Sequence, residues 1–560
     1  MLVALSLAAC DGGRTSDALR KSVGRAVKKA VTAKRPPAPL AGADAITRGW
    51  MRKFYAARSY APVWVNGTAG RDAAKKLHDV LVHADERGLD PADYEVERIA
   101  ALLDSTQAAP FGPAKRTAPF VELELLLTRE FFQYASDVTQ GRLRSPDLGT
   151  AERRVRARRS MVPLLERVAK GEDTDDVLAS AEPAHPGYRR LLEAYARYRT
   201  LLADGGWPRV GPGPDLAPGS RSARVDALRT RLSKSGEYTG DGRKGRAFDA
   251  NLTQAVRTFQ AHAGLPVTGR VSKADVAELD RGVEERVRQI ALNLERWRWL
   301  PSDLGERHVL VNIPEYRLRV LDGESSALEM RVVVGKEFSP TPVFSDTLTY
   351  IVFGPSWGIP ESIANGELLP SARSDPASLT RRHIVVTAGG NDTASIDPAD
   401  IDWDKVESGE AHYSLRQEPG PDNPLGRIKF MCPNQFNVYL HDTPAGHLFG
   451  RGERGFSHGC VRLEDPTALA VLLLDDPQKW DAAHVTAAMD SSHDRTVRLP
   501  HPTPVHLVYW TAWVDPDGAL EFRDDVYGID QASAARLSGY DTAPPAVRTR
   551  PVAPSRVGPS

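Results

Sequence analysis

A cysteine that follows a glycine, in a loop that also carries histidines, is the feature of this sequence best suited to chemistry. The run Ser457-His458-Gly459-Cys460 comes after His441 and a glycine-rich stretch. Thiol catalysis needs a thiolate, a group that takes or shuttles the proton, and donors for an oxyanion. This segment can supply all three. We expect Gly459 to leave room for substrate where a side chain would crowd it.

Three other interpretations of this loop stay open. An inert buried cysteine is one, although polar, glycine-rich surroundings disfavour it. A metal site is another, but the spacings match no zinc pattern and Cys-x-x-Cys is absent from the sequence. A papain-like protease would place its histidine after the cysteine, and His484 and His493 keep that order available. The side chains that could offer metal ligands are Cys432, His441, His447, His458 and Cys460.

Strands must position this loop. Alternating apolar residues predict four strands between residues 308 and 353, and two more at 428–432 and 436–441, so that His441 ends a strand. Asp465-Pro466 then opens a helix. A polar, Asp-rich insertion fills about 360–427, and residues 505–522 read as a final β-hairpin. We therefore predict a mostly-β catalytic domain over 290–530.

The preceding half of the chain is predicted to be helical. Apolar residues recur at helical spacing through 44–204, which indicates a helical scaffold domain. Residues 205–222 are rich in Gly and Pro and read as a linker. A compact unit of three helices follows at 223–283, the third of them capped by Ser272. The expected fold class is thus multidomain α+β.

The spacing of His441 and Ser457-His458-Gly459-Cys460-Val461-Arg462 resembles the signature of L,D-transpeptidases with a YkuD-type catalytic domain. Tyr439-Leu440-His441-Asp442-Thr443-Pro444 is similar to the context of the first histidine in the large Gram-negative subgroup. That resemblance implies a nucleophile at Cys460 and a proton acceptor at His441. The further catalytic positions that it implies are His458 and Gly459, and the substrate-binding positions are Tyr439, Ser457, Arg462 and Trp357.

Other segments extend this resemblance over most of the chain. The order A-V-x-x-F-Q-x-x-x-G-L-x-V-T-G at 255–269 resembles the peptidoglycan-binding type 1 domain. The run 353–360, which contains Trp357, resembles the segment before the insertion that caps the site in that subgroup. The capping insertion is therefore expected at about 360–427.

The resemblance implies a ping-pong acyl transfer without a cofactor. A thioester on Cys460 would form from a tetrapeptide stem and pass to the meso-diaminopimelate of a second stem, giving 3-3 cross-links in the cell wall. Backbone N–H groups around Gly459 and Cys460 are the expected oxyanion donors, and carbapenems are expected to acylate the same cysteine. An L,D-carboxypeptidase and a non-catalytic peptidoglycan-binding protein stay open as alternatives. The acceptor, partner wall-synthesis enzymes and the oligomeric state are left undetermined.

The composition of the chain and its first residues indicate where the protein is located. A chain of 560 residues needs several domains, and equal numbers of basic and acidic residues, 73 each, argue against a nucleic-acid partner. Three cysteines exclude a disulfide-stapled scaffold. Residues 1–10 end in Leu7-Ala8-Ala9-Cys10, which resembles a bacterial lipobox, so we expect lipidation at Cys10 and a membrane-anchored periplasmic protein. Residues 11–43 read as a flexible tether and 540–560 as a disordered tail.

Overall fold

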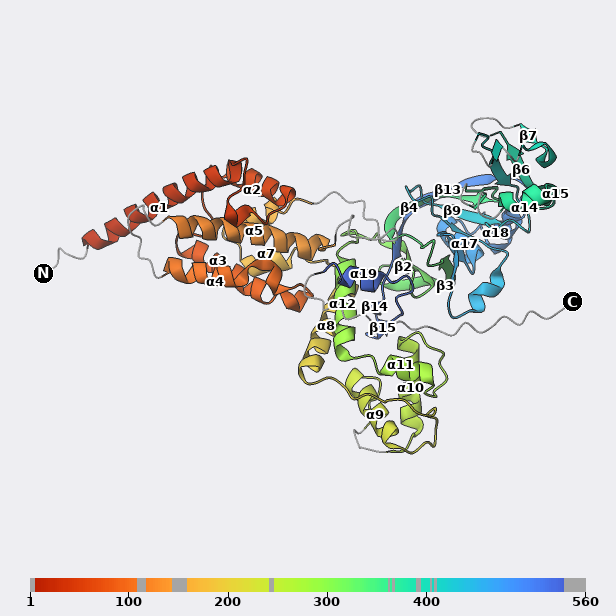
Figure 1. The fold of residues 1–560 in the computed structure, drawn as a ribbon, viewed down its shortest axis with the longest axis horizontal. Helices are drawn as coiled ribbons and strands as arrows, with labels where there is room; N and C mark the ends of the chain where they lie inside the picture. The colour runs from red at the N-terminus through yellow and green to blue at the C-terminus, as the bar shows by residue number, and fades with distance from the viewer. Residues whose placement is uncertain are drawn as a thin grey trace.

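The structure, a computed structural model, describes residues 6–107, 117–143, 159–240, 246–360, 363–364, 368–388, 394–402, 405–406 and 410–537. At residues 6–16 and at residue 369 it describes the backbone alone. The tail predicted at 540–560 lies outside the described residues. A helical body, a small helical module and a β-rich body meet around a central group of elements, as Figure 1 shows.

The helical body is the predicted scaffold. Helix α5 lies in the middle of this bundle. Its apolar and aromatic side chains are buried on nearly every side, as expected for a central helix. Each of the other helices buries one stripe against it or its neighbours. The bundle consists of α1 (Ser6–Thr32), α2 (Ala45–Ala57), α3 (Gly67–Val82), α4 (Val96–Gln107), α5 (Ala118–Gln140), α6 (Val162–Ala169) and α7 (Thr174–Ala179).

The prediction of a flexible tether at 11–43 is wrong, because α1 is part of this bundle. Val23, Val27 and Val31 recur every four residues and are buried in the scaffold core, which the sequence reading missed behind the many Lys and Arg residues. Position 10 lies within α1, but its side chain is outside the described residues. Among the helices of the described residues, none combines the length and the apolar character that crossing a membrane requires.

The three-helix module has the predicted helices, α9 (Ala223–Ser235), α10 (Ala250–His262) and α11 (Lys273–Leu279). Ser272 caps α11 in a capping box with Asp275. The predicted linker at 205–222 is not a free connection, since Val210 and Leu216 are buried in the module's core and Leu216 pairs with Val271. Its glycines and prolines shape turns that lie on the module.

The β-rich body contains one large sheet in the order β11-β3-β12-β10-β9-β4-β13-β1-β2. A further pairing of β2 with β3 closes it on itself. Helices α17 (Pro466–Leu474) and α18 (Ala482–Met489) share its apolar core. The strands are β1 (Arg307–Asn312), β2 (Arg317–Asp322), β3 (Ser325–Gly335), β4 (Phe344–Phe353), β9 (Ile428–Met431), β10 (Leu440–His441), β11 (Gly455–Ser457), β12 (Val461–Leu463) and β13 (Arg495–Val508).

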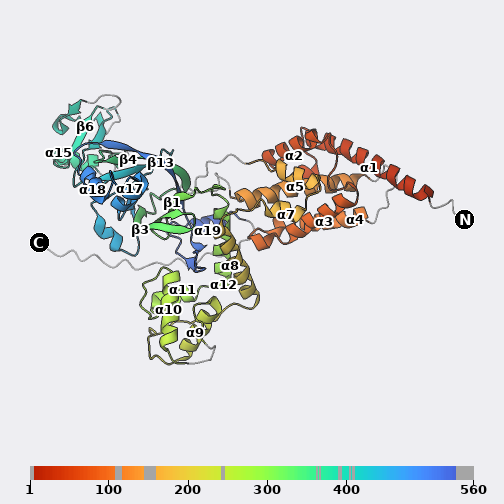
Figure 2. The same ribbon diagram turned by 180° about the vertical axis from the view of Figure 1, so that it is seen from behind.

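The insertion predicted at 360–427 forms a small subdomain with a core of its own. A four-stranded sheet in the order β5-β8-β6-β7 packs with two short helices at the outer end of the β-rich body, as seen from behind in Figure 2. Its elements are β5 (Trp357–Gly358), α14 (Leu369–Ser374), α15 (Ala377–Arg381), β6 (Ile384–Thr387), β7 (Ser395–Ile396) and β8 (Ser414–Gln417).

A central hub joins the three bodies. Helix α8 (Pro186–Ala203), which ends the predicted scaffold and pairs Arg199 with Asp85 there, also packs on α12 (Val283–Trp297) and on the hairpin β14 (Ala512–Val514) and β15 (Leu520–Phe522). The hairpin is shorter than the prediction, because residues up to Val508 belong to β13. Trp297 stacks on Trp510 at 4.2 Å between ring centroids. Helix α19 (Ile529–Ala534) also contacts α12.

Candidate active site

The register of three adjacent strands places the predicted site residues on one face of the sheet. Residue 440 of β10 pairs with Val461 of β12, and His441 pairs with Arg462. Against β9, His441 pairs with Lys429. Paired residues share a face and successive residues alternate. His441, Arg462 and Lys429 therefore lie on the face opposite the apolar core, into which Leu440 and Val461 point.

The nucleophile candidate stands at the start of β12, directly after a turn at Gly459. Gly459 has φ of +116°, in the region that favours glycine. A Cβ added there would meet its nearest atom at 3.7 Å, an ordinary contact. Backbone conformation therefore favours glycine at this position, and the space that Gly459 leaves for a substrate stays a prediction.

The turn is closed by Ser457, whose side chain is buried. Its hydroxyl donates to the Cys460 carbonyl at 2.6 Å and accepts the Gly459 N–H at 3.1 Å. The Gly459 N–H is therefore engaged within the turn. In the part of the chain that the structure describes, the Cys460 N–H has no hydrogen-bond partner. Of the two predicted oxyanion donors, the one at Cys460 is available.

The half-buried Cys460 thiol has a pKa raised above its ordinary value. Burial is the largest cause, because it penalises the charged thiolate. Three groups act against burial and lower this pKa. They are the Tyr439 N–H and the Tyr439 hydroxyl, which donate hydrogen bonds, and the positively charged Arg462. The site thus holds a neutral thiol at rest, with the groups that would stabilise a thiolate already beside it.

His441 is buried at the end of β10, 3% exposed. Its Nδ1 lies 2.5 Å from the Asp442 carbonyl oxygen, which can only accept, so Nδ1 carries a proton and Nε2 is the candidate base. Burial, the largest cause, and the positive charge of Arg462 lower the pKa of His441 to about 3. Hydrogen bonds to the carbonyls of Asp442 and Leu425 act in the opposite direction and raise it. The Tyr439 and His441 rings meet edge to face at 5.8 Å between centroids. Tyr439 therefore contacts both the thiol and the imidazole.

Arg462 supplies a positive charge beside Cys460 and His441. It is half-buried, and burial lowers its pKa while the thiolate form of Cys460 raises it. Its Nε is buried without a hydrogen-bond partner among the described residues. Such an atom costs free energy unless something pairs with it. Arg462 is accordingly suited to a carboxylate or carbonyl group of a substrate.

His458 lies on the other side of the Gly459 turn and is exposed. The Lys336 Nζ is 3.0 Å from its Nε2, so the ammonium donates and the ring nitrogen accepts. The Lys336 N–H also donates to the Ser457 carbonyl at 2.9 Å. The two predicted histidines therefore have different surroundings: His441 is buried on the sheet, and His458 is exposed beside a lysine.

A second loop, residues 335–341, supports the turn and was missed by the sequence reading. The buried Thr341 hydroxyl donates to the Gly459 carbonyl at 2.8 Å and accepts the Gly335 N–H at 2.8 Å. The Tyr527 hydroxyl donates to the Gly335 carbonyl at 2.6 Å. Thr341 and Gly459 are 118 residues apart, so no local pattern could have joined them.

Two other predicted positions lie away from this cluster. Trp357 is half-buried in β5, where it packs on the core of the small subdomain. Cys432 is buried in the core on the opposite face of the sheet, and burial raises its pKa to about 12. Among the described residues, no group of three or more His, Cys, Asp or Glu side chains is gathered closely enough to hold a metal ion.

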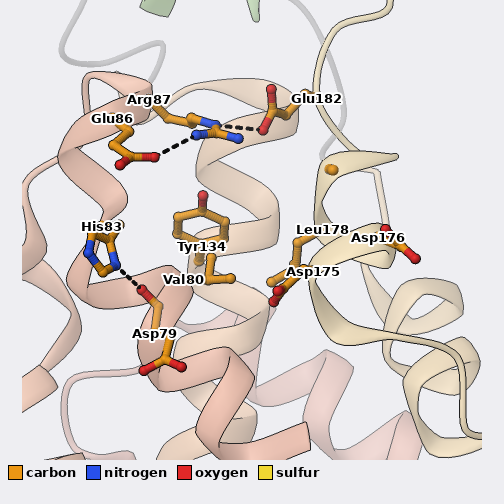
Figure 3. A pocket seen from close by; sticks show the side chains of 11 residues that line it. Asp79, Val80, His83, Glu86, Arg87, Tyr134, Asp175, Asp176, Leu178 and Glu182 are labelled. Carbon is orange, nitrogen blue, oxygen red and sulfur yellow. Dashed lines mark hydrogen bonds and ion pairs between the residues drawn. The ribbon is translucent and has the colours of Figure 1, made fainter. Parts of the chain in front are cut away.

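The scaffold contains a cavity of about 430 Å³, shown in Figure 3, that plays no part in this site. Tyr134 stands in its middle, and Arg87 at one end is paired with Glu86 and Glu182. The carboxylates of Asp175 and Asp176 on its rim belong to exposed residues. None of its lining residues carries a thiol, so the cavity has no nucleophile of the kind found at Cys460.

Three domain families match this chain. Residues 306–483 match the family described as "L,D-transpeptidase catalytic domain", named YkuD. Residues 49–194 match the "Scaffold domain", and residues 221–279 match the "Putative peptidoglycan binding domain". The domain architecture expected from the sequence motifs is therefore confirmed.

A curated relative and several solved structures are similar to parts of the chain. A Haemophilus influenzae protein named "Putative L,D-transpeptidase" is 34% identical over 243 residues, 43% of this chain and 48% of the relative. The chain thus aligns with about half the length of that relative. An L,D-transpeptidase from Mycobacterium smegmatis is 17% identical, with 36% and 58% of the two chains covered and a TM-score of 0.18. One from Stackebrandtia nassauensis is 12% identical, with 54% and 96% covered and a TM-score of 0.22.

Proposed function

Since the chain carries a YkuD L,D-transpeptidase catalytic domain with a scaffold domain and a peptidoglycan-binding domain, we propose that it forms 3-3 cross-links in peptidoglycan through a thioester at Cys460. The observation that carries this proposal is the tautomer of His441. Its Nδ1–H is held by the Asp442 carbonyl, which leaves Nε2 as a base on the face of the sheet that also presents Cys460.

In the first half-reaction, the Cys460 thiol gives its proton to His441 Nε2. The sulfur then attacks the carbonyl between the L-centre of meso-diaminopimelate and the terminal D-Ala of a tetrapeptide stem. The C–N bond breaks, the proton passes from His441 to the D-Ala amine, and a thioester remains. Arg462 and the Tyr439 hydroxyl stabilise the thiolate as it forms, because both already lower the pKa of Cys460.

In the second half-reaction, a neutral amine at the D-centre of another stem attacks the thioester. The C–N bond forms, the C–S bond breaks, and the amine proton returns to the sulfur by way of His441. The Cys460 N–H is positioned to donate to the oxyanion in both halves, since no other group of the described residues uses it. Water in place of the amine would make the reaction an L,D-carboxypeptidase.

We place this reaction at the cell wall outside the cytoplasmic membrane. The support is the match to a peptidoglycan-binding domain at 221–279, together with the lipobox-like run that ends at Cys10. Lipidation at Cys10 would keep the catalytic domain within reach of the wall. A globomycin-sensitive mass shift that disappears in Cys10→Ala tests this part separately from catalysis.

The central test uses the purified protein with a disaccharide-tetrapeptide, read by mass spectrometry, and Cys460→Ala as control. We expect 3-3 dimers and released D-Ala in the wild type and neither in the variant. Trimmed tripeptides without dimers would support the carboxypeptidase instead. Intact-mass analysis with a carbapenem adds a second readout: an adduct that is lost in Cys460→Ala is expected, and neither adduct nor product would favour a non-catalytic wall-binding protein.

A further inference from the structure

A lysine ammonium lies beside the nucleophile turn without an acidic partner among the described residues. Lys336 contacts His458 through Nζ and Ser457 through its main-chain N–H, and no ion pair to it is found in the described part of the chain. The His458 ring nitrogen accepts this bond and its side chain is exposed, so the ammonium group of Lys336 lies beside the Gly459 turn with no carboxylate paired to it among the described residues. A ligand with an anionic group would complete it.

The position of Lys336 relative to Cys460 is set by the backbone. Gly335, which precedes it, is so closely packed that an added Cβ would lie 2.2 Å from the Ser339 carbonyl oxygen. Thr341 closes the far end of the same loop and bonds to the Gly459 carbonyl. A charge held by a rigid loop binds its partner with a smaller loss of conformational entropy than one on a mobile loop.

The other two cations of the site have different surroundings. Arg462 lies on the sheet face and acts on the Cys460 sulfur and on His441. The Lys429 ammonium lies 5.9 Å from the centroid of the Tyr439 ring on that same face. Lys336 belongs to neither strand; it contacts His458, which precedes Gly459, whereas Arg462 lies on the strand that follows Gly459. It therefore faces a different part of a substrate bound at Cys460.

The chemistry of the two amines identifies that part. The amine that leaves in the first half-reaction is D-Ala, and the amine that attacks in the second is the D-centre of diaminopimelate. Both carry a carboxylate on the carbon that bears the nitrogen, and both have the same configuration. Since aminolysis is the reverse of the first step in its bond changes, the attacking nitrogen occupies the place that the leaving nitrogen vacates. One carboxylate subsite can serve both.

We propose that Lys336, held against His458, binds the α-carboxylate of the amine that leaves or attacks the acyl group at Cys460. This inference rests on the proposed transpeptidase activity and assigns the residue that recognises the carboxylate of its acceptor. The thioester C–S bond breaks, the C–N bond forms and the amine proton goes to the sulfur, and Lys336 takes no part in these bond changes.

The experiment compares two acceptors that differ only in this carboxylate. Disaccharide-tetrapeptide is incubated with D-methionine or with D-methioninamide, and exchange of the terminal D-Ala is followed by mass spectrometry. The quantity measured is the ratio of kcat/KM for the two amines. We expect Lys336→Met to lower the ratio roughly tenfold or more, as loss of a charge-assisted hydrogen bond would, and Lys336→Arg to keep most of it.

Lys479→Met is the matched control, since Lys479 is exposed on the same domain and contacts Trp480 instead of the turn. It should leave the ratio unchanged. An equal ratio in the wild type and Lys336→Met would overturn the subsite, and so would a loss of iodoacetamide labelling at Cys460 in Lys336→Met, because Lys336 would then act on the nucleophile. A wild-type protein that exchanges neither amine would contradict the transpeptidase activity itself.

Discussion

The Thr341 hydroxyl donates to the Gly459 carbonyl at 2.8 Å and so ties a distant loop to the turn that precedes Cys460. The same oxygen accepts the Gly335 N–H, which leaves Thr341 with a donor and an acceptor role in a fully buried position. The Tyr527 hydroxyl in turn donates to the Gly335 carbonyl at 2.6 Å. The direction of the Cys460 N–H and thiol therefore depends on residues that contain no catalytic group.

Removing the Thr341 hydroxyl should slow chemistry at Cys460. Thr341→Val keeps the shape but leaves the Gly459 carbonyl and the Gly335 N–H without a partner, at a cost of about 1–3 kcal/mol for each buried polar group. We expect kcat for D-Ala release to fall more than KM changes, and the free energy of unfolding in urea to fall. Thr341→Ser, which keeps the hydroxyl, should restore most of both. Equal rates in the valine and serine variants would contradict this role.

The reactivity of Cys460 should increase only at alkaline pH. Burial raises the pKa of its thiol and lowers that of His441 to about 3, so a thiolate–imidazolium pair is not the resting state. Iodoacetamide labelling of Cys460 should titrate above the ordinary thiol pKa of about 8.5, with no plateau of reactivity near neutrality. Buried Cys432 should stay unlabelled.

Arg462→Gln should move that titration of Cys460 to still higher pH, because the Arg462 charge lowers the pKa of the thiol. Arg462→Lys keeps a positive charge and should move it less. The measurement is the same labelling rate between about pH 6 and 10. A shift toward lower pH in Arg462→Gln would show that burial, which the smaller side chain relieves, outweighs the lost charge.

His441 should make the folded protein less stable in acid. The unfolded chain binds a proton there below about pH 6.5, whereas the folded protein does so only near pH 3. Between these values the unfolded state holds more protons, so the free energy of unfolding falls as pH falls, by about 2 kcal/mol at pH 5. Urea unfolding at pH 7 and pH 5 should show that the wild type loses this much more than His441→Gln. Equal losses would mean that His441 is protonated in the folded protein.

Helix α1 should contribute to the stability of the scaffold. Val27→Ala removes buried methyl groups and should lower the free energy of unfolding by roughly 2 kcal/mol, visible as a lower Tm of the full chain. Arg25→Ala, on the exposed side of the same helix, is the control and should change little. A Tm unaffected by Val27→Ala would be the result expected of a flexible tether.

Short-range patterns were enough to predict the chemistry that we propose for this chain. Ser457 to Arg462 and the strand that ends at His441 lie within 25 residues, and their function depends on local features: a strand end, a glycine turn and a cysteine after it. The helices of the three-helix module follow likewise from periodicity and a capping residue. Such features are local because hydrogen bonds along a strand, turn or helix cap join near neighbours.

Contacts between distant segments could not be foreseen in this way. The support of the turn by Thr341, the charge of Lys336 beside His458 and the hub of α8, α12 and the β14–β15 hairpin all join residues more than 80 positions apart. The prediction of a tether in place of α1 is wrong for a related reason. The exposed Lys and Arg residues of α1 indicate a solvated segment, and only the folded scaffold supplies the surface that buries Val23, Val27 and Val31. Long-range packing depends on which surfaces meet after folding, and residue spacing carries no record of that.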